Sequence, residues 1–109
     1  MKARLDGIYS PDLNHPEIPS DPKDFWVVIH ADIGAHDSEG VDIFTFYFCS
    51  ESKLVHSEMT VPVIVLREFS WEEVEKSIHS FCVSAAGNSW EELARAIGKH
   101  SQWEYAPKS

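Results

Sequence analysis

The densest group of residues that could do chemistry lies between residues 30 and 37. His30 and Asp32 stand two positions apart within an apolar, β-branched segment. Two residues with that spacing on a strand share one face, and imidazole and carboxylate groups both bind divalent metal ions. With His36 and Asp37 close behind, the spacing is compatible with a small metal-dependent hydrolase. The competing interpretation is a half-exposed polar strand face on which His30 is hydrogen-bonded to its neighbouring carboxylate.

Other catalytic patterns are missing from the sequence. It contains no Gly-x-Ser-x-Gly motif, and its scattered glycines form no phosphate-binding loop. The two cysteines, Cys49 and Cys82, are spaced neither as a zinc site nor as a disulfide framework. Cys49 ends an expected strand and Cys82 lies on the apolar stripe of an expected helix. Both are therefore predicted to be free, buried packing residues in a reducing cytosol.

The charge balance limits the classes of partner. Eighteen acidic residues against nine basic ones give a formal net charge of −9. Such a field repels nucleic-acid phosphates and anionic lipid, so no nucleic-acid partner and no membrane partner are expected. It attracts a basic protein. The alternative explanation is that the acidic excess only keeps a cytoplasmic protein soluble.

Length and hydrophobicity predict one folded domain over residues 1–109, because 43% hydrophobic residues suffice for an ordinary core. No apolar stretch of a secretory signal follows the charged start at residues 1–6. The longest apolar runs, at 25–29 and 63–66, are too short to span a bilayer. We therefore expect a cytoplasmic protein.

Alternating and β-branched segments predict strands separated by loops that are rich in proline, glycine and polar residues. The expected order is a strand at 2–9, a proline-rich loop at 10–23, a strand at 25–33, a hairpin loop at 34–40, a strand at 41–49, an unassigned polar segment at 50–60 and a strand at 61–68. In the strand at 41–49 three phenylalanines alternate with Ile43, Thr45, Tyr47 and Cys49. Because both sides are apolar, a central strand covered on each face is expected.

Two helices are predicted from repeated capping boxes. Ser70 with Glu73 opens a helix to about residue 84, on which Val74, Ile78 and Phe81 should face the sheet. A second Ser-Trp-Glu-Glu string, at 89–92, opens a shorter helix that ends at Gly98, and 102–105 could form a closing strand. The predicted fold is α+β, an antiparallel sheet of about four to five strands with the two helices packed on one face.

Short strings that span nearly the whole chain occur in a specific order. They are Lys2-Ala3, Ile-Tyr-Ser-Pro-Asp at 8–12, Asp21-Pro22 leading to Phe25, Asp42-x-Phe44-x-Phe46 ending at Cys49, the segment 63–68, Phe81-Cys82, Ser-Trp-Glu-Glu at 89–92, and Trp103-Glu104-Tyr105. In this order and spacing the chain resembles the immunity protein 8 family, partners of the C-terminal toxin domains of bacterial polymorphic-toxin and contact-dependent growth-inhibition systems. The resemblance implies a toxin inhibitor with no enzyme activity and no cofactor. The matched positions are mainly aromatic, capping and turn residues, so they carry over the fold and the role but not an interface.

Two polar loops are the expected docking points for a basic, nuclease-type toxin, because loops carry recognition without disturbing a core. A hairpin at 34–40 would bring its own charges close to those of the flanking strands, in one compact acidic patch. The partner-binding candidates are Asp32, His36, Asp37, Glu39 and Asp42 at this hairpin, and Glu51, His56 and Glu58 in the second loop. Beside the toxin inhibitor, two readings stay open: the hydrolase built on His30, Asp32, His36 and Asp37, and a general protein-interaction domain.

Overall fold

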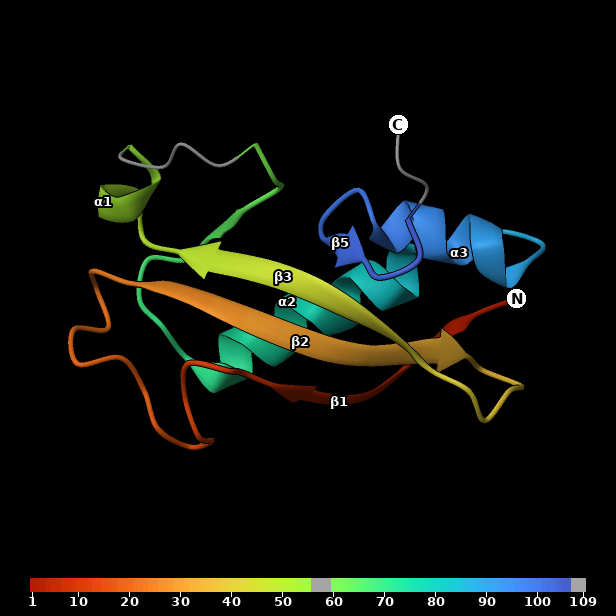
Figure 1. The fold of residues 1–109 in the computed structure, drawn as a ribbon, viewed down its shortest axis with the longest axis horizontal. Helices are drawn as coiled ribbons and strands as arrows, with labels where there is room; N and C mark the ends of the chain where they lie inside the picture. Colours follow the sequence, from red (N-terminus) through yellow and green to blue (C-terminus); the bar gives the residue numbers. More distant parts are fainter. Residues whose placement is uncertain (56–59, 107–109) are drawn as a thin grey trace.

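The computed structural model describes residues 1–55 and 60–106, and its α+β fold confirms the predicted class. Five strands and three helices follow the colour ramp of Figure 1 from red to blue. They are β1 (Ala3–Tyr9), β2 (Trp26–Ala35), β3 (Asp42–Cys49), α1 (Glu51–Leu54), β4 (Ile64–Val65), α2 (Trp71–Ser84), α3 (Trp90–Ile97) and β5 (Gln102–Trp103).

The sheet is built around β3. The strands β1, β2 and β3 form an antiparallel ladder with a register shift between Leu5 and Gly7 of β1, and the other edge of β3 is shared by two short strands. β5 pairs antiparallel with Phe44 and Thr45, and β4 pairs parallel with Phe48 and Cys49. The strand expected at 61–68 is reduced to two residues, which pair with the last two residues of β3.

The hairpin between β2 and β3 is shorter than expected. Gly34 and Ala35 pair with Arg4 and Ala3, so both belong to β2 and the loop begins at His36. Pairing with β1 thus overrides the local turn signal of the glycine. In the polar segment 50–60, a single helical turn, α1, begins after Ser50. Residues 56–59, which include two of the candidate docking residues, His56 and Glu58, lie outside the described part of the chain.

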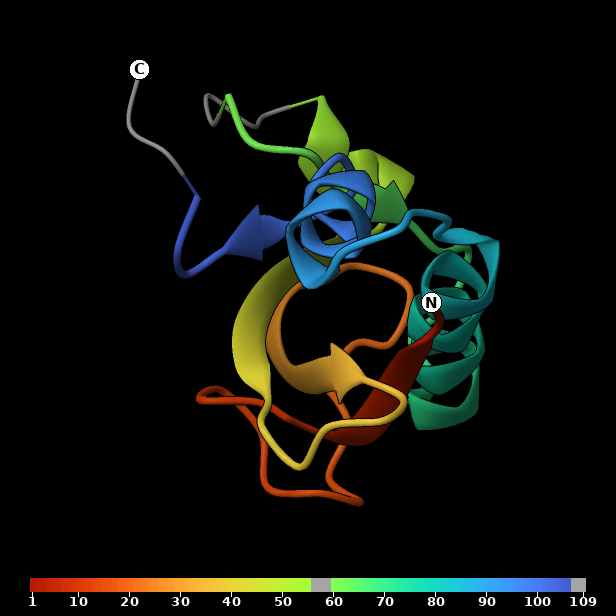
Figure 2. The ribbon, with the colours of Figure 1, turned by 90° about the vertical axis from the view of Figure 1, so that its right-hand side faces the viewer.

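Both long helices cover the same face of the sheet, as predicted. Figure 2 shows α2 and α3 together on one side of the curved strands. Each helix begins as its capping box predicts: the hydroxyl oxygen of Ser70 accepts from the Glu73 amide at 3.4 Å, and that of Ser89 from the Glu92 amide at 3.2 Å. The fully buried side chains on this side include Ile29, Ile33, Phe44, Phe46, Phe48, Val74, Ile78, Leu93 and Ile97.

One side chain of the predicted helix stripe is not buried as expected. Val74, Ile78 and Cys82 follow one another at intervals of four residues and face the core, whereas Phe81 flanks this line and is only half-buried. Its ring stacks between those of Phe46 and His100, at centroid distances of 6.0 and 4.1 Å. Phe81 therefore closes the border of the core instead of filling its centre.

Both cysteines are free and buried, as predicted. Burial raises the pKa of the Cys82 thiol to about 11 and also raises that of Cys49. Both thiols are therefore protonated at neutral pH and serve as packing groups, since the thiolate is the nucleophilic form.

The expectation that β3 is covered on both faces is wrong. The helices described in the structure all lie away from the second face, which is turned toward the viewer in Figure 1. Between residues 26 and 32 of β2 and residues 43 and 47 of β3, the residues on this face alternate with the core residues and are half-buried rather than buried. We call this surface the open face; it is formed by Tyr9 of β1, by Trp26, Val28, His30 and Asp32 of β2, and by Ile43, Thr45 and Tyr47 of β3.

Candidate functional site

The four residues of the suspected metal site are not gathered by the fold. His30 and Asp32 share the open face as predicted, but His30 Nδ1 lies 3.1 Å from the hydroxyl of Thr45 across the strand pair, not on its neighbouring carboxylate. His36 and Asp37 lie beyond the end of β2, where they line a pocket of about 350 Å³ with Met1 and Lys2. Within residues 1–55 and 60–106, no three His, Cys, Asp or Glu side chains are arranged to hold one metal ion.

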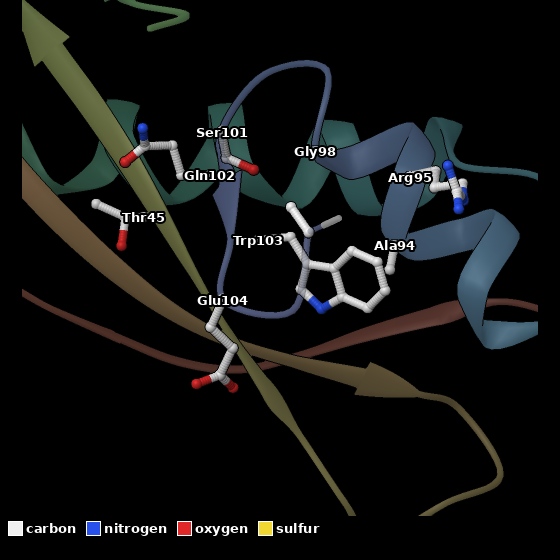
Figure 3. A pocket seen from close by; sticks show the side chains of 9 residues that line it. Thr45, Ala94, Arg95, Gly98, Ser101, Gln102, Trp103 and Glu104 are labelled. Atoms are coloured by element: carbon white, nitrogen blue, oxygen red, sulfur yellow. The ribbon is translucent and has the colours of Figure 1, made fainter. Parts of the chain in front are cut away.

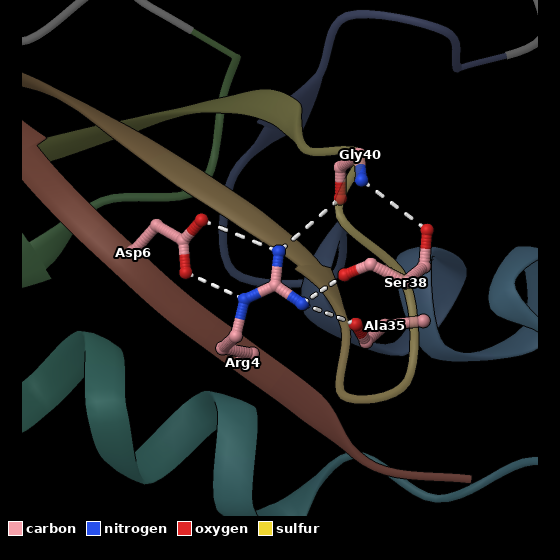
Figure 4. A network of polar contacts seen from close by, with 5 residues as sticks. All are labelled: Arg4, Asp6, Ala35, Ser38 and Gly40. Carbon is pink, nitrogen blue, oxygen red and sulfur yellow. Dashed lines mark hydrogen bonds and ion pairs between the residues drawn. The ribbon is translucent and has the colours of Figure 1, made fainter.

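The hairpin loop is organised by a residue that the sequence reasoning missed. Figure 4 shows the guanidinium of Arg4, on β1, pointing into the loop between β2 and β3. It donates to the carboxylate of Asp6 at 2.6 and 3.2 Å, and to the carbonyl oxygens of Ala35 at 2.6 Å, of Ser38, and of Gly40 at 3.5 Å. The hydrogen bond between the two side chains raises the pKa of Arg4 and lowers that of Asp6. Arg4 thus fixes the loop conformation.

Only part of the expected acidic patch forms. Asp37 and Glu39 are exposed in the hairpin loop, and Asp32 is half-exposed on the open face nearby. Asp42 lies opposite Ile33 in the ladder, so it points to the helix-covered face, away from Asp32. There its carboxylate accepts from the indole N–H groups of Trp90 and Trp103, both at 2.8 Å. Asp42 is therefore held by structural hydrogen bonds.

The close approach of the loop to the sheet makes Gly34 sensitive to substitution. A Cβ at this position would overlap the Gly40 carbonyl oxygen and lie 3.2 Å from Arg4 Nη2. Because the first of these atoms is backbone, relief requires the loop to move. We expect Gly34→Ala to lower the free energy of unfolding by about 2 kcal/mol, measured by urea denaturation. Gly7→Ala, at a position with nothing within 4 Å, is the matched control; equal losses for both variants would contradict the close approach.

The second candidate loop lies at the opposite end of β3. Its described acidic residue, Glu51, begins α1 and lines a pocket of about 390 Å³ together with Lys23 and Arg67. The basic neighbours offset its charge. The structure therefore separates Glu51 from the hairpin acids by the length of β3.

A further pocket lies between α3 and β5 and has a volume of about 670 Å³ (Figure 3). Its charged lining residues, Arg95 and Glu104, are both engaged elsewhere. Arg95 donates to Glu91 at 2.8 Å, and a carboxylate oxygen of Glu104 accepts from the Ile43 amide at 2.7 Å. The pocket therefore presents no acid–base pair poised for catalysis.

The open face carries aromatic side chains where a solvated sheet face is usually polar. The rings of Trp26 and Tyr47 lie 6.0 Å apart, those of Tyr9 and His30 lie 5.3 Å apart, and 44% of Tyr9 is exposed. In the sequence, this face corresponds to the positions that alternate with the core residues of β2 and β3. The same pattern is compatible with a face that is covered by other elements. Aromatic residues on an exposed surface are typical of protein interfaces.

Comparison with known proteins identifies one family. The family model described as Immunity protein 8 matches residues 6–107. Neither the curated proteins nor the solved structures gave a match. Among the described residues, no helix is both long and apolar enough to cross a membrane.

Proposed function

Because the chain belongs to the immunity protein 8 family, we propose that it binds a cognate bacterial toxin domain and neutralises it by occupying its surface. The observation that carries this proposal is the family match over residues 6–107 of the 109-residue chain. The toxin would be the C-terminal domain of a polymorphic-toxin or contact-dependent growth-inhibition protein. The inhibition is stoichiometric and needs neither a catalytic residue nor a cofactor of the immunity protein.

The charge of the chain supports a basic partner of the nuclease type. A net charge of −9 favours rapid association with a protein of opposite sign, whose own positive surface would be needed to hold a nucleic-acid substrate. Such a toxin acts in the cytoplasm of the target cell, and the immunity protein would act there too. Covering the positive surface would exclude the substrate.

Within this proposal the acidic hairpin steers the toxin toward the complex. Of the expected acids, Asp37 and Glu39 are exposed in the hairpin loop with His36, and Asp32 lies on the open face of the adjoining strand β2. Glu51 lies at the other end of β3, and Asp42 is occupied by two indole groups. We therefore assign the charged part of the interface to the hairpin and not to α1.

Co-expression with the toxin encoded by the adjacent gene tests the function. We expect growth to be rescued and a stable one-to-one complex to be recovered by size-exclusion chromatography. A variant of the toxin without catalytic activity allows the complex to be prepared in quantity. Failure of both rescue and complex formation would reject the proposal, whereas several weak partners in a pulldown would favour a general interaction domain.

The steering role of the hairpin predicts a kinetic effect. The double substitution Asp37→Lys/Glu39→Lys should slow toxin association about tenfold at low ionic strength and flatten its dependence on salt. Both residues are exposed, so folding should be unaffected. Stopped-flow association measured over a salt series checks this result.

The control carries the same change of charge elsewhere. Glu68→Lys/Glu75→Lys alters two exposed residues outside the hairpin and should slow association much less. Equal effects of the two pairs would show that only the overall charge matters, and unchanged kinetics of the hairpin variant would place the interface elsewhere.

A further inference from the structure

We propose that the open face of the sheet is the surface on which a basic toxin domain docks. Tyr9, Trp26, Val28 and Tyr47 form its apolar centre, and acidic side chains form its border. This inference rests on the proposed function and adds to it the location and the chemistry of the contact. The hairpin then adjoins one end of the same surface, because its Gly40 carbonyl oxygen occupies the space that a Cβ of Gly34 would need.

The composition of the open face is that of a protein interface. Tyrosine and tryptophan dominate the energetics of protein interfaces, since they bury a large area at a small cost in side-chain entropy. Here they come from three adjacent strands and lie together, with Val28 between them in the alternation of β2. By comparison, Val83 of α2 is 70% exposed, and the residues one turn before it on the helix are the polar His79 and Ser80. Such isolated residues need no partner to explain them.

The open face is held rigid before any partner arrives. β2 and β3 pair without interruption over eight residues each. The hydroxyl of Tyr47 donates to the side-chain oxygen of Gln102 at 2.7 Å, and His30 and Thr45 are within hydrogen-bond distance at 3.1 Å. A surface that is already ordered loses little conformational entropy on binding, which favours a tight complex.

The charged residues in and around the open face favour a basic binding partner. β1, β2, β3 and β5 contain no lysine and a single arginine, Arg4, whose guanidinium is engaged by Asp6 and by loop carbonyl oxygens. Carboxylates border the face on both sides. Asp12 accepts from the Val28 amide at 3.1 Å, and Glu104 accepts from the Ile43 amide at 2.7 Å. With Asp32 on the face itself, the surface is complementary to a protein that presents lysine and arginine around an apolar contact.

The test measures the affinity for the catalytically inactive toxin domain encoded by the adjacent gene. Val28→Lys places a positive charge at the centre of the open face and should weaken binding about 30-fold or more, the loss expected for a hot-spot position. The matched control is Val83→Lys, the same substitution on the exposed side of α2, which should change the affinity less than about twofold. Circular dichroism and thermal unfolding establish that each variant is folded.

A second variant keeps the test decisive if Val28→Lys does not fold. Tyr9→Ala truncates an exposed side chain at the edge of the face and should weaken binding about tenfold. Wild-type affinity of the folded open-face variants would overturn the docking surface while the proposed function stands. No binding by the wild-type protein would overturn both.

A second copy of the chain is the competing occupant. Sedimentation measurements on the protein alone should show a monomer at micromolar concentration. A wild-type dimer that Val28→Lys converts to a monomer would assign the open face to self-association and overturn the proposal.

Discussion

Replacing Phe46 by Ala is expected to lower the free energy of unfolding by about 4 kcal/mol, the usual cost of truncating a fully buried aromatic side chain. Phe46 is 0% exposed and lies at the middle of β3, opposite Ile29 of β2. Its ring centroid is 6.5 Å from that of Phe48 and 6.0 Å from that of Phe81, so its loss leaves a cavity bounded by the sheet and by α2. Urea denaturation followed by tryptophan fluorescence measures the effect.

The next residue along the strand provides the control. Tyr47→Ala removes an aromatic ring from the same strand, but from the half-buried open face, and should cost less than half as much. Equal losses at both positions would show that the open face is packed as tightly as the core. That result would also remove the physical basis of the proposed docking surface.

Asp42→Ala is expected to destabilise the fold by about 3 kcal/mol. The substitution leaves the half-buried indole N–H groups of Trp90 and Trp103 without their shared acceptor, and each unpaired donor costs about 1–3 kcal/mol when buried and less when half-buried. Both indoles pack against Phe44, at centroid distances of 6.2 and 6.3 Å, so the effect reaches α3 and β5. Asp42→Asn keeps an acceptor oxygen and should lose about 1 kcal/mol.

Toxin binding separates this structural role from a role in the interface. At a temperature where it is folded, Asp42→Ala should bind the toxin with wild-type affinity, because Asp42 faces away from the open face. A stable Asp42→Ala protein that had lost toxin binding would return Asp42 to the interface.

Local signals in the sequence predicted the elements that local interactions determine. The two capping boxes located the starts of α2 and α3, since each is a contact between residues three positions apart. The alternation of apolar and polar residues located β1, β2 and β3, because it too is a pattern of residues close together in the sequence. The length and direction of β4 depend instead on its pairing with β3, a contact between distant segments that no local pattern contains.

The candidate site was harder to predict because strand register decides it. Asp32 and Asp42 both flank the hairpin in the sequence, yet the pairing of Ile33 with Asp42 turns their side chains to opposite faces. The role of Arg4 depends on a strand about thirty residues away from the loop that it binds. The aromatic open face was visible as a pattern, but aromatic side chains favour a buried face and an interface equally.

Successive residues of the ten-residue strand β2 point to opposite faces and therefore serve two different roles. The inward positions, such as Ile29 and Ile33, contribute to the stability of the fold. The outward positions, such as Val28 and Asp32, are the ones that we propose contact the toxin. A substitution at an outward position removes no side chain of the core, so the surface that contacts the toxin can change while the core of the fold is retained. Sequence changes that adapt the immunity protein to a different toxin would therefore fall on every second residue of β2.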